Sequence, residues 1–253
     1  MNVDERGWVR FPADARSRAW ADATMAAACR ALEDPALDRW WRHGRTWFAG
    51  VGALPNAPDG AVDNVPLAGP ALDALGWRDS WDKGQISVTR PGYPAQDPEE
   101  TDAAHRYRAV RDAAHVDGLL PVGPKRRRMA REYHGFILGI ALSDASPDAS
   151  PLVVWERSHH VIAEALRAAL EPRPRAAWPD VDLTETYHAA RRRSFETCRR
   201  VTVPLAPGEA VLVHRHALHG VAPWAAGATS APEGRAIAYF RPAIAVEAWL
   251  RDG

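Results

Sequence analysis

Two residues with metal-binding side chains, His115 and Asp117, stand two positions apart in the sequence. In an extended segment, residues i and i+2 project to the same side, so one ion can bind both. The candidate third ligand is His219, the last of three histidines in residues 213–220, and Arg235 follows it on a strand-like run. Two imidazoles and a carboxylate on one face of Fe(II) leave positions open for a chelating ligand, and an Arg suits the far carboxylate of a dicarboxylate.

These motifs differ in how strongly each one indicates a metal site. A His-x-Asp pair is weak evidence alone, because about one is expected by chance at this composition. The later cluster is stronger, because Glu209–His214 predicts a strand that leads into three histidines, of which a buried core residue would explain one. Arg235 alone could be an ordinary strand-edge arginine. The order of the pieces favours a metal centre with an Arg anchor.

Several motifs resemble the phytanoyl-CoA dioxygenase-like family of Fe(II)/2-oxoglutarate oxygenases. The resemblance covers roughly residues 85–242 and rests on Thr89-Arg-Pro-Gly92, His115-Val-Asp117, Leu152-Val-Val-Trp-Glu-Arg-Ser-His159, Leu218-His-Gly220 and Gly234-Arg-Ala-Ile-Ala238. It implies that His115, Asp117 and His219 bind iron and that Arg235 binds the distal carboxylate of 2-oxoglutarate. Arg90 would lie near this cosubstrate. The sequence departs from the family pattern at Glu156-Arg157, where Pro-Gly is usual, and at Val221.

The resemblance also implies a reaction. Its cofactors would be Fe(II), 2-oxoglutarate as cosubstrate and O2, and 2-oxoglutarate would be decarboxylated to succinate and CO2. An unactivated C–H bond of a small-molecule substrate would be oxidised. Within this family a missing carboxylate ligand goes with halogenation, and Asp117 is present, so we expect a hydroxylase.

Two other functions fit the same residues. A cupin-type metal enzyme without 2-oxoglutarate would use three or four ligands, drawing on His214 and His216 as well as the three residues above. A barrel that binds a small molecule without turnover is the second alternative. Arg241 shares the strand parity of Arg235 and is the reserve candidate for the carboxylate anchor.

Composition excludes some classes of partner. Lys plus Arg and Asp plus Glu each number 32, so no net field attracts nucleic acid or an anionic membrane. We expect a small-molecule partner, which would be anionic if the basic cluster 124–131 reaches the site; a solvated loop is the favoured interpretation of that cluster. The two cysteines, the absence of a membrane-length apolar run and the N-terminus together predict a cytoplasmic protein. The oligomeric state is not indicated.

The pattern of elements predicts a mainly β fold with helical cover, a double-stranded β-helix (jelly-roll, cupin-like) barrel. We expect one domain over residues 1–253, with a mainly helical cover and loop in 1–83. A jelly-roll core would occupy 84–242, with a helical insertion at about 160–200. Within the cover, 14–33 and 37–48 are predicted helices. In the core, 84–89 is the predicted first strand, and 152–155 is the predicted hairpin partner of 134–142.

Overall fold

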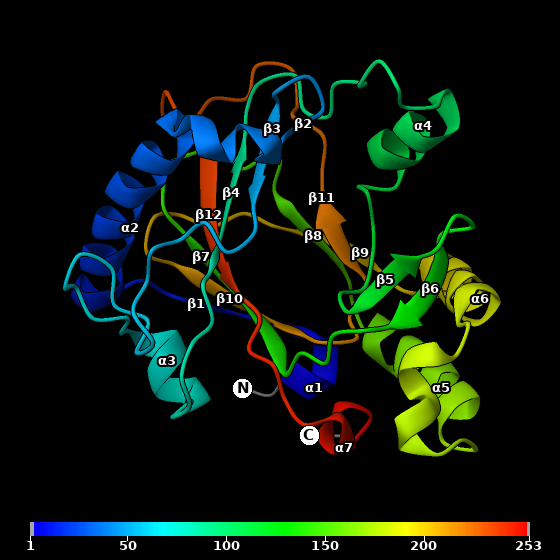
Figure 1. Ribbon diagram of the computed structural model, residues 1–253. Helices are drawn as coiled ribbons and strands as arrows, with labels where there is room; N and C mark the ends of the chain where they lie inside the picture. Colours follow the sequence, from blue (N-terminus) through cyan, green and yellow to red (C-terminus); the bar gives the residue numbers. More distant parts are fainter. Residues whose placement is uncertain (1–2, 252–253) are drawn as a thin grey trace.

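The computed structural model describes residues 3–251, in which two antiparallel sheets face one another with helices outside them (Figure 1). The larger sheet contains, in spatial order, β1 (Trp8–Phe11), β10 (Ala210–His214), β7 (Phe136–Ala141), β12 (Arg235–Phe240), β4 (Gln85–Thr89), β3 (Trp47–Gly50) and β2 (Trp41–Arg42). The smaller sheet contains β11 (His219–Val221), β8 (Leu152–Trp155) and β9 (Arg200–Val203). A separate hairpin joins β5 (Leu119–Val122) to β6 (Arg127–Ala130).

Helices surround the two sheets, and the longest of them pack on the outer sheet faces (Figure 1). The helices are α1 (Val3–Arg6), α2 (Ala15–Glu33), α3 (Pro70–Leu75), α4 (Asp102–Val110), α5 (Ser158–Leu170), α6 (Thr184–Thr197) and α7 (Val246–Trp249), with 3-10 turns η1 (Pro35–Trp40) and η2 (Arg175–Asp180). The predicted helix at 14–33 is confirmed as α2, which begins with a capping box between Asp14 and Ser17. Across the described residues, no helix is both long and apolar enough to span a membrane.

Strand β12 shows how the sequence separates the interior of the barrel from its outer face. Ala236, Ala238 and Phe240 belong to the apolar cluster under α2, whereas Ile237 belongs to the cluster between the two sheets. Side chains alternate along a strand, so Arg235 shares the interior face with Ile237 and Tyr239. The alternation places a charged residue inside a barrel whose other lining is largely apolar.

The N-terminal third differs from the prediction at residues 37–48. This segment was expected to be a helix but contains the end of η1 and the β2–β3 hairpin. His43, Gly44 and Arg45 have φ angles of 53°, 58° and 63°, a left-handed turn that no helix contains. The predicted helical cover over 1–83 therefore also supplies three strands to the larger sheet, and the strand at 85–89 is not the first in the chain.

Two further expectations about local pairing are wrong. β7 pairs with β10 and β12 in the larger sheet, whereas β8 pairs with β11 and β9 in the smaller one, so they are not hairpin partners. The connection at 143–151 crosses between sheets. The basic segment 124–131, expected to be a loop, contributes the turn and strand β6 of the β5–β6 hairpin. Apolar runs identify strands, but a long-range pairing partner is set by the packing of the whole barrel.

Candidate metal centre

His115 and Asp117 lie in the segment between α4 and β5, and a short ladder attaches this segment to the smaller sheet. The His115 amide donates to the His219 carbonyl oxygen over 2.8 Å, and the His219 amide donates to that of His115 over 3.0 Å. The isolated antiparallel bridge therefore joins two predicted ligands that are far apart in the sequence. The expectation that His115 and Asp117 share one side of an extended segment agrees with this geometry.

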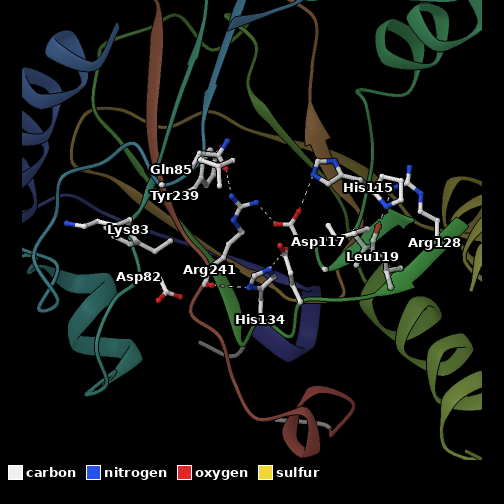
Figure 2. A pocket seen from close by; sticks show the side chains of 18 of the residues that line it. Asp82, Lys83, Gln85, His115, Asp117, Leu119, Arg128, His134, Tyr239 and Arg241 are labelled. Atoms are coloured by element: carbon white, nitrogen blue, oxygen red, sulfur yellow. Dashed lines mark hydrogen bonds and ion pairs between the residues drawn. The ribbon is translucent and has the colours of Figure 1, made fainter. Parts of the chain in front are cut away.

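The three predicted ligands meet at one point, where one ligand atom from each lies within 4.8 Å of the others. Asp117 is central. Its Oδ1 is 3.3 Å from Nε2 of His115, the contact drawn in Figure 2. Its Oδ2 is 3.9 Å from Nε2 of His219. The His115 side chain is 52% exposed, whereas those of Asp117 and His219 are 11% and 9% exposed. One face of the group is thus open, and the donor set is the one that Fe(II) binds in facial triads.

Both imidazoles are oriented by backbone carbonyls. Nδ1 of His115 lies 3.0 Å from the Ala113 oxygen, and Nδ1 of His219 lies 2.9 Å from the Ala217 oxygen. A carbonyl oxygen only accepts, so each Nδ1 carries a proton, and each Nε2 is left to face the carboxylate. Hydrogen bonds of this kind fix the tautomer and ring direction of metal-binding histidines.

The charges at the triad are strongly coupled. Burial alone would raise the pKa of Asp117, but His115, His219 and Arg241 hold it well below its usual range. Burial and the neighbouring His115 lower the pKa of His219 to about 4. Burial lowers the pKa of His115, but the hydrogen bond and charge of Asp117 outweigh this and raise it. At neutral pH the site therefore offers an ionised carboxylate and a neutral His219.

An ion pair between the exposed Arg200 and the buried Asp112 holds the ligand segment in place. The Asp112 carboxylate accepts from Nε and Nη2 of Arg200 over 2.7 and 2.8 Å, and the Asp112 carbonyl accepts from Val221 over 2.9 Å. A Cβ on Gly220 would lie 2.1 Å from that carbonyl, so glycine permits the close approach. Tyr187 on α6 adds a hydroxyl that accepts from the Val116 amide over 3.2 Å. Sequence reasoning missed these supports, because Arg200 and Tyr187 are far from the ligands in the chain.

Arg235 lies inside the barrel, where its Nη2 finds no hydrogen-bond partner among residues 3–251. The residue is 6% exposed, and its Nη2 is buried without a hydrogen bond. Thr89, directly opposite Arg235 in the register of β12 and β4, also has a buried hydroxyl without a partner. Unpaired buried donors are costly, and a bound carboxylate would satisfy them. These two residues thus fit the distal carboxylate of 2-oxoglutarate.

Two cavities meet at the triad and share His115, Asp117, Gln85, Tyr239 and Arg241. The larger, of about 520 Å³, lies toward the β5–β6 hairpin and is lined by several charged residues. The smaller, of about 280 Å³, extends between the sheets, and its apolar lining includes Ile137, Leu152 and Val213. The two are called the polar cavity and the barrel cavity below. This arrangement gives a metal ion access to one polar and one apolar compartment.

No family model matches the sequence, and no curated protein is similar to it. Among solved structures, the non-heme alpha ketoglutarate dependent carbocyclase SnoK from nogalamycin biosynthesis aligns with a TM-score of 0.55 and 17% identity, over 95% of this chain and 81% of that chain. AviO1 from Streptomyces viridochromogenes Tue57 aligns with a TM-score of 0.52 and 16% identity, over 95% and 91%.

The chain has the fold of the non-haem, 2-oxoglutarate-dependent oxygenases. The predicted double-stranded β-helix is therefore confirmed, together with the resemblance in fold. Identities this low say nothing about substrate or product.

Arg90 is not brought to the triad of the oxygenase fold. Its guanidinium lies 4.3 Å from the centre of the Trp41 ring, and its Nε donates to the Glu233 oxygen over 3.0 Å. Trp41 belongs to the outer apolar cluster, so these contacts hold Arg90 away from the cavities. Its expected role in cosubstrate binding stays a prediction. Arg241, the reserve candidate, instead contacts Asp117, with Nη1 3.3 Å from Oδ2.

Two arginines of the basic cluster form ion pairs with aspartates. Arg127 lies 3.3 Å from Asp182, and Arg131 lies 3.1 Å from Asp180. Only Arg128 of this cluster lines the polar cavity, where its Nη1 donates to the Leu119 oxygen over 3.2 Å. Arg128 is therefore the one member of the cluster that reaches the cavity beside the triad.

His214 and His216 do not join the triad. Within residues 3–251, the only metal-like group of three is that of His115, Asp117 and His219. Nδ1 of His214 accepts from the His216 amide over 3.1 Å, and His216 packs against Trp249 with ring centres 5.0 Å apart. A four-ligand cupin-type set is therefore not assembled.

Proposed function

We propose that this protein is an Fe(II)- and 2-oxoglutarate-dependent oxygenase that oxidises an unactivated C–H bond of a small-molecule substrate. The observation that carries the proposal is the convergence of two carbonyl-oriented imidazoles and one carboxylate at the meeting point of two cavities. The balanced charge of the chain supports a small molecule rather than nucleic acid or a membrane as partner.

The residues at and near the triad are suited to the proposed reactants. His115, Asp117 and His219 would hold the iron, and Arg235 with Thr89 would bind the distal carboxylate of 2-oxoglutarate inside the barrel. Apolar residues such as Ile137, Leu152 and Val213 would exclude water from the barrel cavity. Bound iron, 2-oxoglutarate and O2 would supply the oxidant, with succinate and CO2 as coproducts. The protein contributes metal geometry, cosubstrate orientation and a dry cavity.

Hydroxylation is the outcome that we propose. The carboxylate ligand Asp117 occupies the position that the resemblance leaves open only in halogenating enzymes. SnoK is named a carbocyclase, so this fold also supports another oxidative outcome in that protein. Product analysis by mass spectrometry separates the two outcomes, because hydroxylation adds one oxygen atom and cyclisation removes two hydrogen atoms.

The test is turnover of 2-oxoglutarate by the purified protein. With Fe(II) and O2 we expect succinate, and we expect Asp117→Ala and His115→Ala to reduce its formation below detection, because each removes a metal ligand. The matched control is Asp82→Ala, which removes an exposed carboxylate from the rim of the polar cavity and should retain turnover. Wild-type protein that binds neither Fe(II) nor 2-oxoglutarate would refute the assignment.

A further inference from the structure

Arg241 lies on the wall between the polar cavity and the barrel cavity (Figure 2). It follows β12 directly, and about 20 Å of strand separates it from Arg235. Its Nη1 is 3.3 Å from Oδ2 of Asp117, and its Nη2 donates to Oε1 of Gln85. The Arg241 side chain is 24% exposed, so part of the guanidinium still faces the cavity. Arg235 at the start of β12 and Arg241 just after its end therefore lie at opposite ends of the barrel interior.

With the proposed reactants bound, Arg241 would have no anionic partner of its own. The metal would take the charge of Asp117, which is the anion that now faces Arg241. Fe(II), Arg235 and Arg241 would then face Asp117 and the two carboxylates of 2-oxoglutarate, leaving one positive charge uncompensated. A half-buried cation beside a cavity is stabilised by an anionic ligand.

The other charged residues of the polar cavity do not supply that anion. Lys83 and Arg128 balance Asp82 and Glu132 in formal charge. Glu132 is 3.1 Å from His134, and Asp82 is exposed. Neither acid has an ion pair with Arg241 in the described structure.

Gln85 adds a second donor at the same place. An arginine only donates, so Gln85 presents its oxygen to Arg241 and its amide NH2 is free to donate elsewhere. The guanidinium and this amide together match the two oxygens of a carboxylate. Around them, Leu119, Tyr239 and Phe240 give the polar cavity apolar walls.

We propose that the second substrate is a monocarboxylate with an apolar body, and that Arg241 and Gln85 bind its carboxylate. Arg241 exchanges the carboxylate of Asp117 for that of the substrate once a metal holds Asp117. This substrate class rests on the proposed oxygenase function. It goes beyond that function by naming the group that selects the substrate and orients it toward the metal.

The experiment uses paired probes with the same apolar body, phenylacetate with phenylacetamide and 2-naphthoate with 2-naphthamide. Each is titrated anaerobically into protein loaded with Fe(II) and 2-oxoglutarate, so that the cosubstrate already occupies the metal positions that a carboxylate could take. Binding is measured by calorimetry and by the visible charge-transfer absorption of the chelated Fe(II). We expect at least one carboxylate to bind about tenfold or more tightly than its amide, as charge-assisted hydrogen bonds require.

Arg241→Gln, which keeps a hydrogen-bond donor but removes the charge, should reduce this preference to about one. The matched control is Lys83→Gln, which removes an exposed cation from the same cavity and should keep the preference. Circular dichroism melting of each variant separates misfolding from lost recognition, and Arg241→Lys should restore part of the preference.

The outcomes separate the two proposals. Absence of the charge-transfer absorption in wild-type protein overturns the oxygenase assignment itself. If that absorption forms but no carboxylate binds at millimolar concentration, or amides bind equally well, the substrate class is wrong. Equal losses in Arg241→Gln and Lys83→Gln would show a diffuse positive field instead of recognition by Arg241, and would also overturn it.

Discussion

Two groups of histidines lie in this chain, and they differ in what surrounds them. The metal triad contains His115 and His219, whereas a second group, called the buried histidine cluster, contains His159, His214 and His216. The triad has Asp117 between its imidazoles. Among the described residues, the ligand atoms of the buried histidine cluster do not converge in a second set of three.

The direction of the free ring nitrogen is the second difference. In the triad each Nδ1 faces a carbonyl and each Nε2 faces the carboxylate. In the buried histidine cluster, Nε2 of His159 donates to the backbone carbonyl oxygen of Asp4 over 2.8 Å. The Nδ1 of the same ring is buried against Gly7. A metal site thus depends on a carboxylate and on convergent lone pairs, and the number of histidines does not decide it.

The most direct test of this difference between the two groups is to replace one histidine in each and measure Fe(II) binding. His219→Gln should weaken Fe(II) binding at least about 100-fold, more than losing a supporting residue does. His216→Gln should leave Fe(II) affinity within about threefold and lower the melting temperature, because it replaces a buried ring beside Trp249. Anaerobic Fe(II) titration followed by calorimetry gives both affinities. Equal losses would favour the cupin-type ligand set.

A second test compares Arg235 and Arg90, the two residues predicted from the sequence to bind 2-oxoglutarate. Arg235→Ala should weaken 2-oxoglutarate binding about 100-fold, because loss of a buried charge partner costs roughly 2–5 kcal/mol. Arg90→Ala should change it by less than about threefold, since Arg90 stacks on Trp41. Titration of the charge-transfer absorption with 2-oxoglutarate measures both. A large effect at Arg90 would support the role that the resemblance implies for it.

The smallest expected effect concerns pH and the buried histidine cluster. Burial, with the nearby His159 and Arg215, lowers the pKa of His214 to about 3, so the folded protein holds this imidazole neutral. The unfolded chain binds a proton near pH 6.5, so stability from His214 is complete above that pH and is lost as pH falls toward 3. We expect a loss of about 1.4 kcal/mol per pH unit in this window.

Chemical denaturation of wild type and His214→Gln between pH 7 and pH 5 tests this. The variant should show a shallower fall in the free energy of unfolding, although it starts from a lower stability. Parallel slopes for the two proteins would show that His214 does not carry the effect.

From the sequence, the three residues that converge in the candidate centre were easier to predict than the residues that support them. His115, Asp117 and His219 were identifiable because their chemistry and order are specific, and α2 was identifiable from local composition. The β2–β3 hairpin was missed because its tryptophans suit a helix face as well as a strand, and the left-handed turn is visible only in the backbone. The role of Arg200 could not be predicted, because its partner Asp112 is 88 residues away.

The reciprocal backbone bond between His115 and His219 has a thermodynamic consequence. It closes a chain segment of about a hundred residues, whose ends meet only in the folded protein. An ion bound by both side chains would cross-link the two ends of that segment. Its binding free energy would then add to the free energy of unfolding of the whole barrel. At a free concentration a hundred times its dissociation constant, such an ion would add about 2.7 kcal/mol to the free energy of unfolding. The stability of the barrel would therefore depend on the concentration of the ion.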